Sequence, residues 1–101
     1  MSRYVLSPEA ADDLVEIWLY VESQSRPEIA DRVVAEIRAK IEVICISPGI
    51  GHRRRDLSDG DLRFFAAYSY LIVYRPTTKP LQIASILHGR RDVERILDDR
   101  P

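Results

Sequence analysis

The chain changes its hydrophobic period near Leu62. Ahead of that residue, apolar side chains recur every three or four positions, as in helices with one buried face. Beyond it, residues 63–67, 71–75 and 81–87 are rich in aromatic and β-branched side chains, which predicts strands. A length of 101 residues suits one domain. The helices and the strands are therefore expected to share one core.

Two helices are expected before the change of period, and each begins at a proline. Ser7 can cap the first, and Pro8 suits its first position; it should end near Ser23. The second should run from Pro27 to about Ile46, and the short link predicts an antiparallel hairpin. The first apolar stripe is Leu14, Ile17, Trp18 and Val21, with Trp18 expected in the core. The second is Ala30, Val33, Val34, Ile37, Ile41, Ile44 and Cys45. Asp12, Asp13, Glu16 and Glu22 are expected on the polar surface of the first helix.

The strands complete an α+β architecture. A short strand at residues 4–6 opens the chain, and residues 68–70 and 76–80 are expected in turns. In the last strand, one face should carry Leu81, Ile83, Ser85 and Leu87. The predicted order is β-α-α-β-β-β. It gives an N-terminal strand and a helical hairpin packed on a mainly antiparallel sheet.

Composition excludes several classes of protein. The single cysteine, Cys45, cannot form an internal disulfide, and its place on an apolar stripe predicts a buried, inert thiol. No segment approaches the ~20 apolar residues of a membrane span, and no signal-peptide pattern opens the sequence. We therefore expect a cytoplasmic protein without a membrane partner. No spacing of Cys, His and carboxylates predicts a metal site, and no motif predicts a cofactor.

Charge is segregated along the chain. Residues 1–51 carry five Lys/Arg and nine Asp/Glu, whereas residues 52–91 carry eight and three. The net charges are −4 and +5, although the whole chain has a net charge of −1. The basic block begins at Arg53-Arg54-Arg55 and ends at His88-Gly89-Arg90-Arg91. Such a block favours an anionic partner, either a nucleic acid or an acidic protein.

Four segments carry a family resemblance: YVLSPEAADDLVEIWLYV, SPGIGHRRRDL, LRFFAAYSYLIVYRP and ILHGRRD. Together they resemble the ParE-type toxins of the RelE/ParE superfamily, and the likeness extends from Tyr4 to about Leu97. The resemblance implies a RelE/ParE-like toxin fold and a single toxin domain over residues 1–101. It further implies a type II toxin–antitoxin system, in which a ParD-like antitoxin forms a hetero-oligomer with the toxin. The implied target is DNA gyrase.

A ribosome-dependent mRNA endonuclease of the RelE type is the first alternative, and a non-toxic nucleic-acid-binding module is the second. Cleavage needs a base, an acid and stabilisation of phosphorane charge. Arg63, Arg75, His88 and Arg90 are the candidates for these roles. RelE-type relatives usually carry a tyrosine or similar group in the tail, and the residues after Arg91 include none. This departure favours a non-enzymatic protein.

The candidate residues for binding a target or partner are the basic block and one tyrosine. Tyr20 lies off the apolar stripe of its helix, and tyrosine is enriched at interfaces. Competing interpretations are a solvated loop for the three consecutive arginines, ion pairs with nearby aspartates, and a structural hydrogen bond for the histidine. The candidates are Arg53, Arg54, Arg55, Arg63, Arg75, His88, Arg90, Arg91 and Tyr20.

Overall fold

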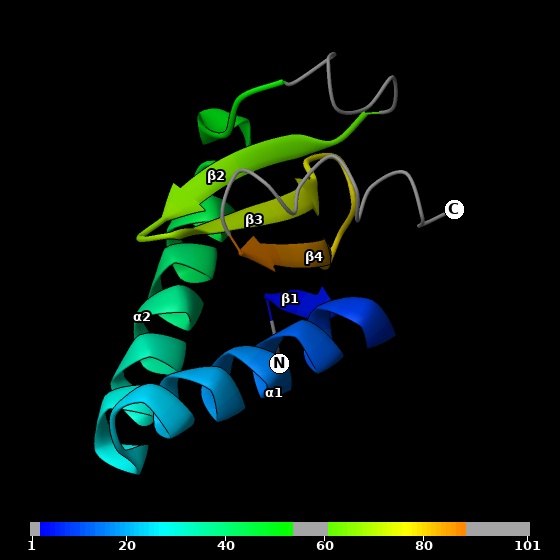
Figure 1. Cartoon of the computed structure of the whole chain (residues 1–101). Helices are drawn as coiled ribbons and strands as arrows, with labels where there is room; N and C mark the ends of the chain where they lie inside the picture. Colours follow the sequence, from blue (N-terminus) through cyan, green and yellow to red (C-terminus); the bar gives the residue numbers. More distant parts are fainter. Residues whose placement is uncertain (1–2, 54–60, 89–101) are drawn as a thin grey trace.

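A computed structural model describes residues 3–53 and 61–88 of the chain (Figure 1). The helices are α1 (Pro8–Gln24) and α2 (Pro27–Ile46), followed by the short 3-10 turn η1 (Pro48–Ile50). The strands are β1 (Tyr4–Leu6), β2 (Arg63–Ala67), β3 (Tyr70–Arg75) and β4 (Leu81–His88). The predicted α+β order is confirmed, and α2 has the predicted bounds.

The four strands form one sheet in the order β1-β4-β3-β2. β1 pairs with β4 in parallel, and the other two pairings are antiparallel, so the sheet is mainly antiparallel as predicted. The turn between β2 and β3 is shorter than predicted, since Tyr70 already belongs to β3. Tyr68 takes the left-handed backbone conformation there, with a φ of 59°.

Both helices pack against the same face of the sheet. The main core combines Leu14 and Ile17 of α1 with the buried isoleucines of α2 and inward side chains of all three long strands. A second, smaller cluster of Phe64, Val73 and Leu87 lies on the other face. Trp18 does not belong to the main core, which corrects the prediction. It is half-buried, and its indole N–H donates to Asp31 Oδ1 at 2.8 Å, which joins the two helices.

The alternation of β4 is interrupted by a bulge. Val73 pairs with Ser85, whereas the next residue of β3, Tyr74, pairs with Ile83. Ala84 is therefore an extra residue in β4. A bulge of this kind moves every later side chain of the strand to the opposite face.

The bulge corrects the predicted faces of β4. Ile83 and Ile86 both pack in the main core under the helices, while Leu87 packs in the second cluster. The expectation that Ser85 and Leu87 share a face with Ile83 is therefore wrong. As a further result, His88 lies on the helix side of the sheet, next to α1.

The start of α1 satisfies backbone groups of β4 that have no strand partner. β1 has three residues and its pairing with β4 ends at Ile83. Beyond it, the Ser7 hydroxyl donates to the Ala84 carbonyl at 2.7 Å while accepting the N–H of Ala10 as the helix cap. The Ile86 N–H donates to a carboxylate of α1, described below. A short β1 thus allows side chains of α1 to reach the edge of β4.

Candidate functional site

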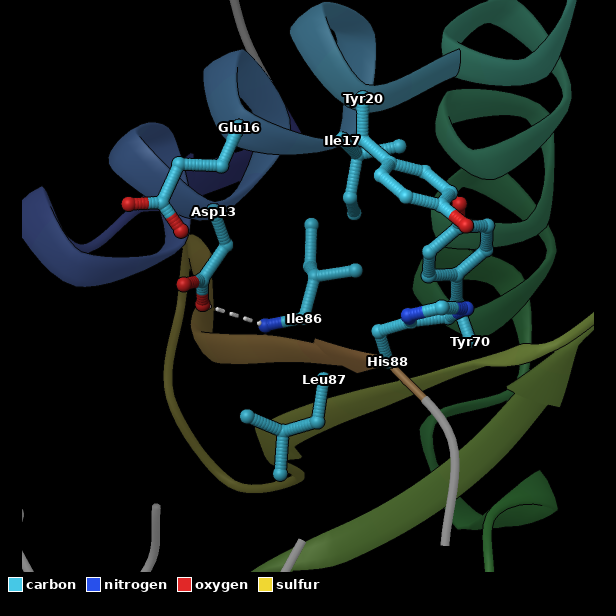
Figure 2. Close-up of a pocket in the computed structure, with 8 residues that line it drawn as sticks. All are labelled: Asp13, Glu16, Ile17, Tyr20, Tyr70, Ile86, Leu87 and His88. Carbon is cyan, nitrogen blue, oxygen red and sulfur yellow. Dashed lines mark hydrogen bonds between the residues drawn. The ribbon is translucent and has the colours of Figure 1, made fainter. Parts of the chain in front are cut away.

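A pocket of about 230 Å³ opens between α1 and the end of β4 (Figure 2). The α1 side is formed by Asp13, Glu16, Ile17 and Tyr20, whose spacing of three, four and seven residues places them on one helical face. The remaining lining residues are Tyr70, Ile86, Leu87 and His88. In the view of Figure 2, two carboxylates stand at one end, three rings stand at the other, and Ile17 and Ile86 lie between them.

The acidic end combines a buried and an exposed carboxylate. Asp13 is only 8% exposed, and its Oδ2 accepts the N–H of Ile86 at 2.9 Å. The expectation that Asp13 lies on the polar surface is therefore wrong. Glu16, one helical turn further on, is exposed as expected. Both carboxylates face a pocket whose described lining includes no lysine or arginine.

The aromatic end brings together two side chains that the sequence singled out. The ring centroid of His88 lies 5.7 Å from that of Tyr20 and 4.9 Å from that of Tyr70. Tyr70 is buried, whereas Tyr20 is 53% exposed. Burial raises the pKa of Tyr70, and the neighbouring Tyr20 hydroxyl raises it further. Tyr20 and His88 thus belong to one site, and they reach it from α1 and β4.

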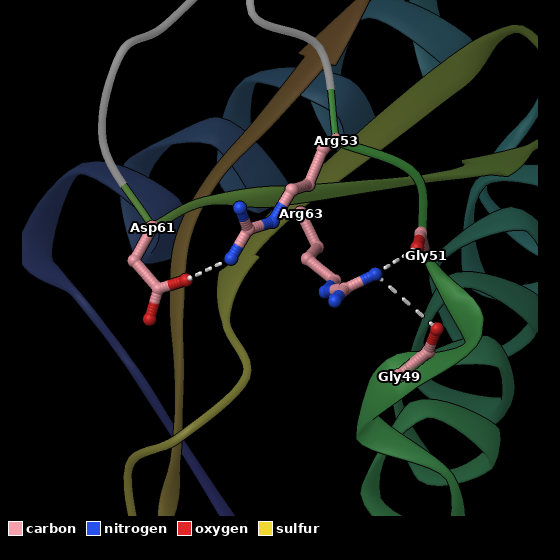
Figure 3. A network of polar contacts seen from close by, with 5 residues as sticks. All are labelled: Gly49, Gly51, Arg53, Asp61 and Arg63. Atoms are coloured by element: carbon pink, nitrogen blue, oxygen red, sulfur yellow. Dashed lines mark hydrogen bonds and ion pairs between the residues drawn. The ribbon is translucent and has the colours of Figure 1, made fainter.

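Arg63 contacts the backbone of the η1 loop (Figure 3). Its Nη1 donates to the Gly51 carbonyl at 3.0 Å and to the Gly49 carbonyl at 3.5 Å. Its Nε is buried, without a hydrogen-bond partner among the residues that the structure describes. An ion pair with a nearby aspartate was the competing interpretation for Arg63; Asp61 pairs with Arg53 instead, and Asp56, Asp59 and Asp92 lie outside the described residues. The arginine therefore stabilises a loop, which leaves its role in partner binding a prediction.

The same loop is held by a buried tyrosine. The Tyr74 hydroxyl donates to the Pro48 carbonyl at 2.6 Å and accepts the N–H of Gly51 at 2.9 Å. Burial raises the pKa of Tyr74, while the Gly51 N–H and the charge of Arg63 act in the opposite direction. The contacts explain the need for glycine at position 51, where an added Cβ would lie 2.5 Å from the Tyr74 hydroxyl.

Arg53 forms an ion pair with Asp61 at 3.2 Å (Figure 3). Both side chains are about half exposed, at 51% and 50%. An exposed pair of this kind contributes about 0–1 kcal/mol, so a partner could replace Asp61 at little cost. Among the other predicted arginines, Arg54 and Arg55 lie outside the described residues, and so do Arg90 and Arg91.

Arg75 lies on the face of the sheet away from the helices. It follows Tyr74, which points into the main core, and it pairs with the exposed Gln82 of β4. Its side chain is exposed, and among the described residues no ion pair of Arg75 is seen. It therefore occupies a different surface from the pocket.

The three described candidates for nuclease chemistry, His88, Arg63 and Arg75, do not lie close to one another. His88 is paired with Tyr70, whereas Arg63 is paired with Tyr74, four residues further along β3. At about 3.3 Å per residue, this separates them by roughly 13 Å along the strand. Arg75 lies on the opposite face, and Arg90 is outside the described residues. The arrangement offers no shared phosphate site for the three described side chains.

Sequence reasoning missed three of the pocket residues. Asp13 and Glu16 have the pattern of a solvated helix face, and Tyr70 was expected in a turn. A signal was present in the spacing of Asp13, Glu16 and Tyr20 along one helical face. The spacing indicates a pocket only when the end of β4 is known to pack against this face of α1.

In residues 3–53 and 61–88, no group of three or more His, Cys, Asp or Glu side chains could hold a metal ion. Within the same residues, neither helix is apolar enough over a sufficient length to cross a membrane.

Cys45 is half-buried. Burial raises the pKa of its thiol, and the negative charge of Glu42 raises that pKa further, whereas the positive charge of Arg3 lowers it.

Comparison with known proteins identifies the family. The family model described as "ParE toxin of type II toxin-antitoxin system, parDE" matches residues 4–93. The chain belongs to this family. Toxin ParE1 of Mycobacterium tuberculosis (strains CDC 1551 and H37Rv) is 32% identical over 97 residues, which cover 95% of this chain and 98% of the relative.

Another ParE-family relative and a solved structure agree with this assignment. Toxin ParE1 of Caulobacter vibrioides is 35% identical over 88 residues, covering 87% of this chain and 90% of the relative. A solved chain from the "Chromosomal ParDE TA system from P. aeruginosa" superposes with a TM-score of 0.72. It is 20% identical, and the match covers 88% of this chain and all of that one. The likeness confirms the ParE fold. The protein is thus a toxin of a ParDE-type toxin–antitoxin system.

Proposed function

We propose that this toxin inhibits DNA gyrase without catalysing a reaction, by binding and stabilising a gyrase–DNA state. Family membership over residues 4–93 is the observation that carries the proposal. The separation of His88, Arg63 and Arg75 supports a non-catalytic mode of action, because acid–base cleavage requires its groups to converge on one phosphate. We place the protein in the cytoplasm, where gyrase acts.

The antitoxin is proposed to be a ParD-like chain that forms a hetero-oligomer with the toxin. The surface offers exposed cations at Arg53 and Arg75, which an acidic segment could pair with. It also offers exposed apolar side chains on α1, Val15 and Leu19, which are 57% and 53% exposed and lie one turn apart. An amphipathic helix with acidic residues can use both kinds of contact.

A supercoiling assay with the purified full-length chain tests the target. Inhibition of gyrase that is abolished by the chain encoded next to the toxin gene is the expected result. Gyrase that is unaffected at saturating toxin refutes the proposal. Cleaved messenger RNA in expressing cells, without an SOS response, indicates the RelE-type activity in its place.

A second experiment concerns the end of the basic block. Changing both Arg90 and Arg91 to alanine should reduce growth arrest on induced expression, because the change removes two cations from the surface proposed to meet the target. The circular dichroism spectrum and the melting temperature should stay as in the unchanged chain. Full toxicity in the double variant would remove both residues from the site.

A further inference from the structure

We propose that a helix of the antitoxin covers the outer face of α1 and carries lysine or arginine beside its apolar residues. The inference rests on the proposed function, because it names the chemistry of one segment of that partner. Acidic residues elsewhere in the antitoxin suit the exposed Arg53 and Arg75. The segment that lies on α1 has the opposite charge.

Helix α1 has a second apolar stripe in addition to the one in the core. Leu14 and Ile17 are buried in the main core. At about 100° per residue, Val15 and Leu19 lie on the opposite side of the helix, one turn apart, where they are 57% and 53% exposed. Ala11, one turn before Val15, is also exposed and lengthens the stripe. Because a surface helix usually has one apolar face, the second face favours a partner.

Carboxylates surround the two exposed apolar residues. Asp12 lies three positions before Val15, while Glu16 and Glu22 lie three positions before and after Leu19, and residues at this spacing are neighbours on a helix surface. None of the three carboxylates forms an ion pair with a described residue. The helix itself contains no lysine or arginine. A partner that covers this stripe therefore meets only negative charges on α1.

The same charges disfavour two other occupants of this face. DNA in the proposed gyrase–DNA state presents phosphates, which the carboxylates of α1 would repel. A second copy of the toxin that packed α1 against α1 would bring only like charges together, because this helix has no cation. The antitoxin has neither constraint, since it can supply cations at the positions that face the carboxylates.

A helix fits the spacing of the stripe. Val15 and Leu19 lie one turn apart, and the apolar residues of a facing helix recur every three or four positions, so the two rows can interdigitate. Lysine or arginine three or four positions from those apolar residues would reach Asp12 and Glu16. Their methylene chains would at the same time cover the rim of the stripe. The predicted segment thus combines an apolar row with basic residues beside it.

Two double variants of the toxin test the charges in its complex with the chain encoded next to the toxin gene. Asp12→Asn with Glu16→Gln removes two carboxylates beside the stripe and should weaken the complex roughly three- to thirty-fold, as expected for two exposed ion pairs. Glu9→Gln with Glu42→Gln removes the same charge outside the stripe and should leave the dissociation constant unchanged. All four positions are exposed, so both proteins should fold. Equal weakening in the two would overturn the proposal.

A double-mutant cycle identifies the cation on the partner. Each lysine and arginine of the neighbouring gene's product is changed to glutamine, and affinity is measured with the unchanged toxin and with the variant that lacks the charges of Asp12 and Glu16. At least one cation should lose its effect in that variant, because its partner carboxylate is absent. If the losses add independently for every cation, the proposal fails.

Gyrase inhibition by the toxin alone separates this inference from the proposed function. The variant at Asp12 and Glu16 should inhibit gyrase as the unchanged toxin does, and a matching loss of inhibition would assign α1 to the target. If the neighbouring chain neutralises the toxin but binds both double variants equally, the inference fails and the proposed function stands. If gyrase is unaffected by the unchanged toxin, the proposed target fails, while the affinities still test α1. A neighbouring chain that does not bind the toxin refutes this inference.

Discussion

The carboxylate of Asp13, in the second turn of α1, accepts the backbone N–H of Ile86 in the bulged strand β4 at 2.9 Å. The two residues are 73 positions apart in the sequence. Because β1 stops pairing at Ile83, this contact takes the place of a strand partner. It fixes α1 against β4 and forms the acidic end of the pocket.

Removing the Asp13 carboxylate should destabilise the toxin. Asp13→Ala leaves a buried N–H without an acceptor, which costs about 1–3 kcal/mol. Asp13→Asn keeps an acceptor oxygen and should lose less. Asp12→Ala, at the exposed neighbouring position, is the control and should change stability by less than about 0.5 kcal/mol. Urea unfolding gives the three values, and equal losses in Asp13→Ala and Asp12→Ala would contradict a structural role.

The two glycines of the η1 loop should respond differently to alanine. At Gly51 the new Cβ would lie 2.5 Å from the Tyr74 hydroxyl, whereas at Gly49 nothing lies within 4 Å. Overpacking of this kind costs about 1–3 kcal/mol, so Gly51→Ala should lower the melting temperature. Gly49→Ala should have little effect. Thermal unfolding followed by circular dichroism compares them, and a Gly51→Ala protein as stable as the parent would disprove the close contact.

Stability should fall in alkali because two tyrosines are buried. Burial raises the pKa values of Tyr70 and Tyr74 above the ordinary value of about 10. Above that pH the unfolded chain loses protons that the folded chain keeps, so the free energy of unfolding decreases as pH rises. The contribution is fully present below about pH 10. Denaturant unfolding between pH 8 and 11 measures the slope.

The matched variant Tyr70→Phe removes one of the two ionisable groups without removing its ring. Its stability should decline less steeply with pH than that of the parent protein. Absorbance of tyrosinate near 295 nm, recorded on the folded protein, follows the ionisation independently. A slope that is the same in both proteins would show that Tyr70 does not contribute.

Alanine substitutions at Arg63 and Arg75 should affect stability differently, because Arg63 contacts a loop whereas Arg75 is exposed. Arg63→Ala removes the donor to the carbonyls of Gly49 and Gly51 and should cost about 1–2 kcal/mol. Arg75→Ala alters an exposed position and should stay within about 0.5 kcal/mol of the parent. Chemical unfolding decides the first point. Growth arrest by a stable Arg75→Ala chain shows whether the exposed face meets the target, and undiminished arrest removes Arg75 from the contact.

Local signals predict the helices well. The proline that opens α2 and the stripe from Ala30 to Ile44 lie within that segment, and the pair Pro48-Gly49 follows shortly after its last residue. They require no knowledge of the rest of the chain. The predicted bounds of α2 are therefore the observed ones.

The bulge in β4 depends on contacts that no local pattern contains. Ser7 and Asp13 reach Ala84 and Ile86 across more than 70 positions. Nothing within residues 81–88 indicates that the alternation will shift, because apolar residues occupy both faces of this strand. The position of His88 beside Tyr20 follows from that shift, and the pocket was consequently not predictable from the sequence.

The extra residue Ala84 decides which side chains of β4 face α1. With strict alternation from Ile83 onward, His88 would lie on the opposite face of the sheet from Tyr70. The ring contacts of His88 with Tyr20 and Tyr70 would then be lost. One inserted residue therefore determines whether the aromatic end of the pocket exists.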